Sequence, residues 1–309
     1  MSNSYLELPK TELHLHLEGS VEPETLCEID PSLTLDEVRA RYEYADFAGF
    51  IESYKWLIER LNTPEDYALI ARRTLERLAR ERVTYAEITV SAGLVLWRGQ
   101  EFAPIYDALQ AEAAASPVEV RWILDATRQW GPEKGMEVAR LAADRVCCGT
   151  IAFGIGGSEA AGPVEWFSDV FRFALDAGLH LTVHAGESVG PESVWGAVRL
   201  GARRIGHGIR AADDPKLLDH LRERDIPLEI CISSNVATRV VSSLREHPVR
   251  RIYDAGVPIV LASDDPAMFH TTLTKEYELA AREFGFTDQE LSGIVENGFR
   301  YAFGEARRQ

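Results

Sequence analysis

The feature that most constrains the fold is a regular alternation of short β-type runs with amphipathic stretches. The stretches between most runs show helical periodicity over about ten to twenty residues. Eight runs rich in β-branched or apolar residues recur along the 309-residue chain, at 12–17, 83–90, 119–127, 150–157, 180–187, 203–208, 227–235 and 258–266. Such alternation predicts an α/β protein with a parallel sheet, and eight units predict closure into a (β/α)8 TIM barrel.

The one long departure from this alternation covers residues 20–62, between the first and second runs. It contains helix-like pieces at 23–29 and 45–61. We interpret it as a helical insertion at the barrel mouth, acting as a lid or pocket wall, or alternatively as a peripheral pair of packing helices. Because the chain has no internal repeat beyond the alternation and no linker, we expect a single domain over 1–309.

Charge and composition limit the kinds of binding partner that the sequence predicts. The net charge is −16 and no basic run occurs, so nucleic-acid binding is not expected. No stretch reaches the roughly 20 apolar residues that a membrane helix needs, and no apolar signal core begins the chain. The cysteines form neither a disulfide framework nor a cysteine zinc site. These features predict a cytoplasmic protein without a membrane partner, and they leave the oligomeric state open.

Polar residues gather at the ends of the predicted strands. His14 and His16 close the first run, His184 the fifth and His207 the sixth; Asp264 and Asp265 close the eighth, and Glu187 lies just past His184. The carboxyl ends of barrel strands form the active-site face, so these groups should converge on one mouth. Alternation places His14, His16 and Glu18 on one face of the first strand, pointing inward. The other face carries Leu13, Leu15 and Leu17, which we expect to pack against helices.

Three imidazoles and one carboxylate in this placement predict a metal site. His14, His16, His184 and Asp264 suit Zn²⁺, which prefers nitrogen ligands and keeps a position for water in catalytic sites. The alternative is a pair of histidines satisfied by backbone carbonyls. None of the five lysines lies near the fourth run, where a second metal would need a bridging ligand, so one zinc per chain is expected.

The remaining groups at the mouth have chemical and structural interpretations. His207 could accept a proton from the attacking water or stabilise hydroxide, or be a buried structural histidine. Glu187, held protonated by desolvation, could serve as an acid, or could orient a histidine. Asp265 could orient the water or cap a turn, and Gly157 could bring a backbone N–H to a ligand or form a tight turn. Other residues are assigned lesser roles: Ser233, Ser234 and Asn235 should face the mouth, whereas His180, His220, His247 and His270 should be structural.

The segments LPKTELHLHLEGS, TVHAGES, RIGHGI, SSN and SDDPAMF, in this order, resemble the adenosine deaminase family of the amidohydrolase superfamily over essentially the whole chain. The resemblance implies that the four predicted ligands hold zinc and that Glu187 protonates purine N1. It further implies that His207 assists the hydroxide, that Asp265 orients it and contacts N7, and that the Gly157 N–H meets N3. The P-C-x-x-C motif that the other zinc deaminase class needs for its metal is absent.

Two positions depart from the best-known adenosine deaminases. Glu18 stands where those enzymes have an aspartate that contacts ribose, and Ser158 replaces an acidic residue after Gly157. The glycine-rich loop resembles bacterial members acting on 6-aminodeoxyfutalosine. The resemblance thus implies zinc-dependent hydrolysis of a 6-aminopurine nucleoside, adenosine or a 5′-substituted relative such as 6-aminodeoxyfutalosine, to the 6-oxopurine and ammonia. The alternatives are an adenine deaminase acting on the free base and a non-catalytic nucleoside-binding barrel.

Overall fold

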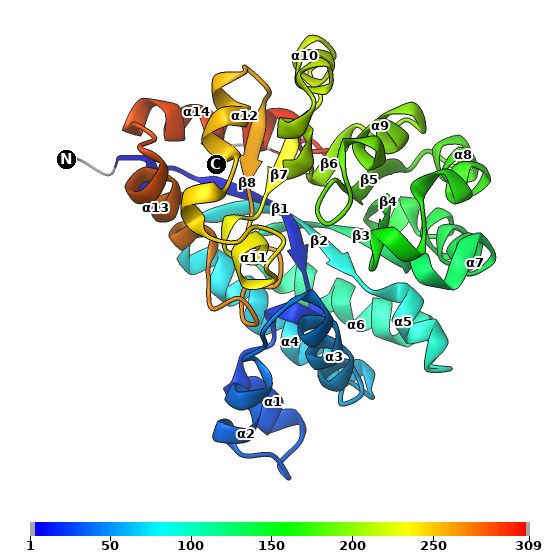
Figure 1. Ribbon diagram of the computed structural model, residues 1–309. Helices are drawn as coiled ribbons and strands as arrows, with labels where there is room; N and C mark the ends of the chain where they lie inside the picture. The colour runs from blue at the N-terminus through cyan, green and yellow to red at the C-terminus, as the bar shows by residue number, and fades with distance from the viewer. Residues whose placement is uncertain (1–3, 307–309) are drawn as a thin grey trace.

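The computed structural model describes residues 4–306, so the first and last three residues of the predicted domain 1–309 lie outside the described part. Eight parallel strands form one sheet in sequence order, surrounded by helices (Figure 1). The strands are β1 Lys10–His16, β2 Val83–Val90, β3 Glu119–Thr127, β4 Thr150–Gly156, β5 His180–Ala185, β6 Arg204–His207, β7 Leu228–Ile230 and β8 Ile259–Leu261. A parallel bridge between Leu15 and Asp264 links the end of the sheet back to β1. The predicted (β/α)8 barrel is confirmed.

Helices follow the strands and cover the outside of the barrel. Helix α4 illustrates the local signals: Thr63 caps it by accepting from the Asp66 N–H, Pro64 is its first residue, and its apolar side is buried. Beyond the insertion, the helices are α4 Pro64–Arg80, α5 Ala92–Trp97, α6 Phe102–Ala115, α7 Gly131–Ala143, α8 Ser168–Asp176, α9 Pro191–Arg199, α10 Pro215–Glu223, α11 Ile232–Ala237, α12 Val249–Asp254, α13 Leu273–Phe284 and α14 Asp288–Tyr301. Within residues 4–306, no helix is long and apolar enough to cross a membrane.

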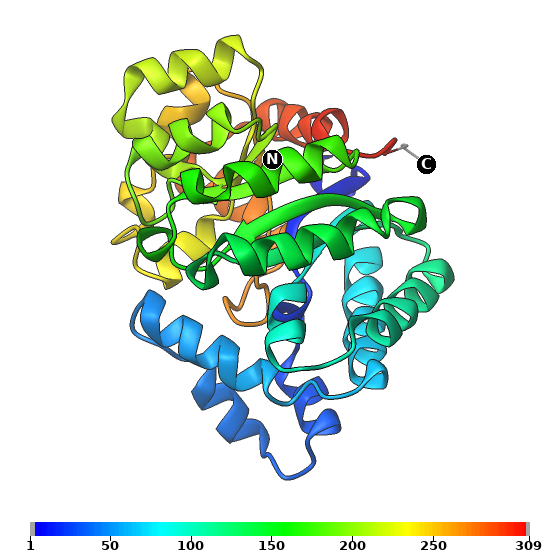
Figure 2. The same cartoon turned by 90° about the vertical axis from the view of Figure 1, so that its right-hand side faces the viewer.

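The insertion divides into two parts. It contains α1 Pro23–Ile29, α2 Leu35–Arg41 and α3 Phe47–Ile58. Helices α1 and α2 pack on each other and project from the barrel (Figure 2). Helix α3 instead supplies several side chains to the cavity at the barrel mouth. Helix α3 thus forms part of the cavity wall, whereas α1 and α2 pack on each other and supply none of its lining residues. A role of the insertion as a lid stays a prediction.

The predicted run 227–235 is wrong in its second half. Strand β7 ends at Ile230, and Ser233, Ser234 and Asn235 lie on helix α11. The carboxylate of Glu276, from distant α13, accepts hydrogen bonds from the backbone N–H groups of Ile232 and Ser233 at 2.9 and 3.3 Å. This buried carboxylate satisfies donors at the start of α11, and no local pattern reveals a partner so far along the chain.

The predicted outward orientation holds for two of the three leucines in and just after β1. Leu15 and Leu17 join the large core between strands and helices. Leu13 instead packs with Tyr85 and Val260, and lines a small internal cavity together with His14. The pairing of β1 with β2 shifts register between Glu12 and Leu15, so the strict alternation fails at this point.

Candidate active site

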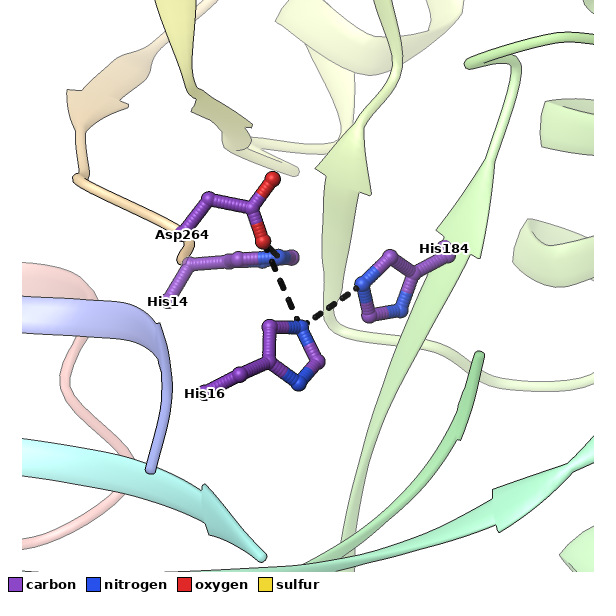
Figure 3. A group of neighbouring side chains, drawn as sticks. All are labelled: His14, His16, His184 and Asp264. Atoms are coloured by element: carbon purple, nitrogen blue, oxygen red, sulfur yellow. Dashed lines mark hydrogen bonds and ion pairs between the residues drawn. The ribbon is translucent and has the colours of Figure 1, made fainter. Parts of the chain in front are cut away.

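The four predicted ligands converge at the carboxyl ends of the strands. Their ligand atoms all lie within 4.8 Å of one another (Figure 3). The Nε2 atoms of His16 and His184 are 3.1 Å apart, and Oδ1 of Asp264 lies 3.4 Å from His16 Nε2 and 3.5 Å from His14 Nε2. His14 Nε2 is buried and has no hydrogen-bond partner in the described chain. Three imidazoles and a carboxylate facing one point, with an unsatisfied nitrogen among them, fit a zinc ion.

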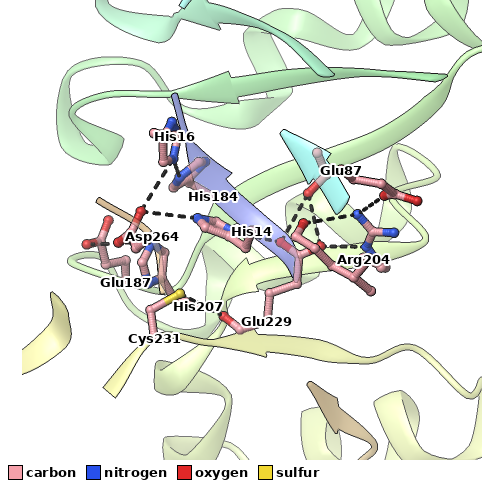
Figure 4. Close-up of polar contacts among 12 residues, drawn as sticks. His14, His16, Glu87, His184, Glu187, Arg204, His207, Glu229, Cys231 and Asp264 are labelled. Atoms are coloured by element: carbon pink, nitrogen blue, oxygen red, sulfur yellow. Dashed lines mark hydrogen bonds and ion pairs between the residues drawn. The ribbon is translucent and has the colours of Figure 1, made fainter. Parts of the chain in front are cut away.

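The far side of two ligand rings is held by hydrogen bonds. His14 Nδ1 donates to Glu229 Oε2 at 2.6 Å, and His184 Nδ1 donates to the carbonyl of Ile155 at 3.2 Å. A proton on Nδ1 leaves the Nε2 lone pair free to face the centre of the cluster. Figure 4 shows that His14 lies between this cluster and a buried ion pair of Arg204 with Glu87. These bonds fix the ring orientations that a metal site requires.

Two residues of the site adopt left-handed backbone conformations. Asp264 has φ +63° and His207 has φ +59°. Such conformations are uncommon for residues other than glycine and cost on the order of 1 kcal/mol. The backbone of Asp264 is anchored to β1, since its N–H donates to His14 O at 2.9 Å and its carbonyl accepts from the His16 N–H at 2.8 Å. The closure of the barrel thereby presents the Asp264 side chain at its mouth.

The predicted catalytic residues surround the ligand cluster. His207 Nε2 lies 3.8 Å from Glu187 Oε1 and 3.8 Å from Asp264 Oδ2. Burial raises the pKa of the Glu187 carboxyl to about 8, and the nearby Asp264 charge adds to the effect. Burial, with the adjacent Asp264 charge, also holds the pKa of Asp265 well above its usual range. A protonated carboxyl at the site is therefore available as a proton donor at neutral pH.

The segment that carries Glu187 is held by a second carboxylate. Glu159 accepts hydrogen bonds from four consecutive backbone N–H groups, Gly186 to Val189, at 2.7–3.1 Å. It also accepts from the Ser193 hydroxyl at 2.6 Å. A loop whose amides are all satisfied by one buried group has little freedom. Glu159 thus fixes the position of the proposed acid.

One cavity opens onto these groups. Its wall includes His16, His184 and Asp264 of the cluster, together with Glu187, His207, Asp265 and Gly157. Aromatic and apolar side chains form much of the rest: Phe47, Phe50, Ile51, Tyr54, Leu94, Trp130 and Phe269. Such a cavity suits a flat, largely apolar heterocycle with a few polar edges.

Glu18 and Gly157 occupy different positions relative to this cavity. Glu18 is fully buried behind its wall and accepts from the Ser91 N–H at 3.0 Å and the Tyr54 hydroxyl at 3.3 Å. Tyr54 and Ser91 themselves line the cavity, so a direct contact of Glu18 with substrate stays a prediction. Gly157 has φ +90°, and a Cβ there would collide with the Gln129 side chain. The position requires glycine.

Sequence reasoning missed Asp125 and the partners of the ligands. Asp125, on β3, lines the cavity, and its Oδ1 has no hydrogen-bond partner in the described residues. Burial raises the pKa of this carboxyl to about 7. Its signal was a charge near the end of an apolar strand, which Glu229 in β7 shares. Glu159 carried no comparable signal, because it lies in a short 3₁₀ turn after β4.

A parallel barrel with an H-x-H pair on its first strand, a histidine on its fifth and an aspartate after its eighth defines an amidohydrolase-type enzyme. The adenosine deaminase family model matches residues 9–309, and the chain belongs to this family. It is therefore a hydrolytic deaminase acting on purines rather than a non-catalytic nucleoside-binding barrel.

Relatives support the same assignment. The chain is 40% identical to an aminodeoxyfutalosine deaminase of Streptomyces coelicolor, over 97% of this chain and 81% of the relative. It is 38% identical to an adenine deaminase of Rhizobium leguminosarum bv. trifolii, over 96% of this chain and 95% of the relative. A crystal structure of an amidohydrolase from Burkholderia ambifaria with bound Zn has a TM-score of 0.90 and 26% identity, covering 98% of this chain and 88% of the other.

Proposed function

We propose that the chain hydrolyses the 6-amino group of a purine nucleoside, adenosine or a 5′-substituted relative such as 6-aminodeoxyfutalosine. Water replaces the amino group, giving the 6-oxopurine and ammonia. The observation that carries the proposal is one cavity whose wall joins the ligand cluster and the buried Glu187 to an aromatic surface. The similarity to an aminodeoxyfutalosine deaminase supports the nucleoside.

One zinc ion per chain is the proposed cofactor, held by His14, His16, His184 and Asp264. Bound zinc supplies Lewis-acid chemistry, lowering the pKa of water so that a nucleophile is available at neutral pH. The unsatisfied Nε2 of buried His14 supports this ligand set, as does the zinc in the Burkholderia ambifaria structure. Elemental analysis should find about one zinc per chain in wild type and a large loss in His184→Ala. Two tightly bound ions would overturn the single-metal proposal.

The residues around the cluster have separate catalytic and substrate-binding roles. Glu187, protonated because it is buried, donates its proton to purine N1, which makes C6 electrophilic. Asp265 faces the cavity from beside Asp264 and orients the attacking water and purine N7. The backbone at Gly157 meets N3, where a side chain would not fit. His207 faces the attacking oxygen between Glu187 and Asp264. The purine is thus held along its edges while one proton is delivered.

Besides the groups assigned to the purine, the cavity wall includes Lys55 on α3 and Gln129 and Trp130 after β3. These additional polar and aromatic side chains support a substrate with a sugar and a 5′ substituent over the free base. The similarity to an adenine deaminase favours the second candidate, a deaminase of the free base, and Glu18 is compatible with either substrate.

A side-by-side assay separates these candidates. Ammonia release is measured from adenine, adenosine, methylthioadenosine and 6-aminodeoxyfutalosine with the zinc-loaded enzyme. We expect kcat/KM to be highest for a nucleoside and much lower for adenine. A strong preference for adenine would replace our proposal by the second candidate.

A further inference from the structure

His207 is the start of a buried chain of hydrogen bonds that leads away from the site. Its Nδ1 lies 3.1 Å from Nδ2 of Asn235 on α11. Oδ1 of the same amide lies 3.0 Å from Nε2 of His247, and His247 Nδ1 accepts from the backbone N–H of Val249 at 3.2 Å. All three side chains are at most 4% exposed, so each bond is shielded from water. This row of hydrogen bonds thus connects the Val249 backbone N–H to the His207 ring, whose Nε2 faces the site.

The direction of every bond follows from the last one. The Val249 N–H is always a donor, so His247 Nδ1 must be an acceptor. Burial lowers the pKa of His247 to about 3, so the ring is neutral and its single proton lies on Nε2. That proton is donated to Asn235 Oδ1, which directs the amide N–H₂ toward His207 Nδ1. His207 Nδ1 therefore accepts, and the proton of its neutral ring lies on Nε2.

We propose that Asn235 and His247 are positioning residues that hold His207 as the neutral Nε2–H tautomer, so that His207 acts in the site as a hydrogen-bond donor. This inference rests on the proposed deaminase function and decides between the two roles that the sequence left open for His207. To act as a base, His207 would need a lone pair on Nε2. The hydrogen bonds from His247 and Asn235 keep that atom protonated. The donor faces the protonated carboxyl of Glu187, the carboxylate of Asp264 and the oxygen that attacks the purine.

The first test observes the tautomer directly. The zinc-loaded protein is labelled with ¹⁵N-histidine, and the His207 signals are assigned by their loss in His207→Gln. We expect an unprotonated Nδ1 and a protonated Nε2. A protonated Nδ1 with a bare Nε2 would overturn the proposal. Because this readout needs no substrate, its result stands apart from whether the enzyme deaminates the proposed purine.

The second test removes His247, the outer side chain of this row of hydrogen bonds. His247→Phe keeps a ring but cannot donate to Asn235, so the amide is free to rotate. We expect kcat to fall about tenfold with KM within about twofold, and His207 to show a mixture of tautomers. His247→Gln places an amide N–H near the lost Nε2 and should restore most of kcat. Equal activity in wild type and both variants, with an unchanged His207 spectrum, would show that His247 has no positioning role.

The third test asks what His207 does. Gln at position 207 can accept from Asn235 with its oxygen and present an N–H₂ donor to the site, but it cannot act as a base. A donor role predicts kcat for His207→Gln at least about tenfold above His207→Ala, with equal zinc content in the two variants. If both variants are equally inactive while holding zinc, the donor role is wrong.

Discussion

Two buried polar regions share the interior of this barrel, and they differ in how completely their groups are paired. Inside the barrel behind the cluster, Arg204 contacts Glu87 and Glu229 at 2.6 Å each (Figure 4). Its guanidinium carbon also lies 3.7 Å from the ring centre of Phe303. At the mouth, His14 Nε2, Asp125 Oδ1 and Asp265 Oδ1 are buried without hydrogen-bond partners in the described chain. Charged groups are thus closely paired in the Arg204 network, whereas the mouth keeps buried polar atoms without hydrogen-bond partners.

The difference separates structural from functional polar residues. A buried polar atom without a partner costs about 1–3 kcal/mol, so several together persist only where another molecule supplies the partner. The Arg204 network has its partners within the chain and needs no ligand. Glu229 joins the two regions, because one oxygen binds Arg204 and the other binds His14. Substitutions at the mouth should therefore lower activity with little change in stability. Substitutions in the Arg204 network should lower stability with little change in activity.

The largest effect on activity is expected for Glu187→Gln. The amide has the same shape but no acidic proton, so purine N1 is not protonated. We expect kcat to fall about 10²–10⁴-fold while zinc content and unfolding free energy stay near wild type. Steady-state ammonia release and elemental analysis measure both. Glu165→Gln, which only breaks an exposed pair with Arg199, is the matched control. A near wild-type rate for Glu187→Gln would remove it from the mechanism.

Glu87→Gln should show the reverse pattern. Oε2 of Glu87 forms an ion pair with Arg204. Oε1 of Glu87 accepts hydrogen bonds from the Tyr85 hydroxyl and the Phe303 N–H. An amide places donors against Arg204 and leaves its charge less compensated, at a cost on the order of 3 kcal/mol. Urea denaturation should show this loss, with kcat of the folded enzyme within about twofold of wild type.

The control for Glu87→Gln is Glu119→Gln, on the neighbouring strand β3. Glu119 pairs with Arg121 at 2.8 Å, but both side chains are about one-third exposed. An exposed pair contributes less than about 1 kcal/mol. Equal losses of stability in the two variants would mean that the Arg204 network does not stabilise the barrel.

Glu229→Gln tests the residue that joins the two regions. An amide cannot accept from both His14 and Arg204, so the His14 ring loses its fixed tautomer or the arginine loses its partner. We expect zinc affinity to fall about 10–100-fold, measured by competition with a chelator, and stability to fall as well. Stability loss with unchanged zinc affinity would assign Glu229 to the Arg204 network alone.

The sequence was sufficient for what depends on local pattern. Periodicity predicted the barrel, and β2 and β3 have the predicted bounds. His14, His16, His184 and Asp264 meet because the topology brings all strand ends to one face. Where pairing is non-local, prediction failed: the register shift in β1 turned Leu13 inward, and Glu276 ended β7 early by satisfying α11.

The supporting residues were hidden for the same reason. Glu229 and Glu159 act on partners contributed by other strands and loops, so their roles depend on distances that no window of sequence contains. Asn235 was expected at the mouth, but its partner His207 could not be read from the sequence. His247 was expected to be structural and is not one of the predicted site residues. The fold nevertheless connects it to His207 through two hydrogen bonds, both made by Asn235. A charge or amide in an apolar stretch signals that a buried partner exists, but not which one.

The smallest effect is expected from the pH dependence of stability at His247. Its folded-state pKa of about 3 lies below the ordinary value near 6.5, so protonation favours the unfolded chain. Its contribution is complete above about pH 6.5 and is lost as the pH falls toward 3. At pH 5 this amounts to about 2 kcal/mol, since each pH unit in this window costs about 1.4 kcal/mol. His247→Gln cannot titrate, so between pH 7 and 5 it should lose about 2 kcal/mol less stability than wild type in urea denaturation. Parallel pH profiles for the two proteins would show that burial does not hold the His247 ring neutral in this pH range.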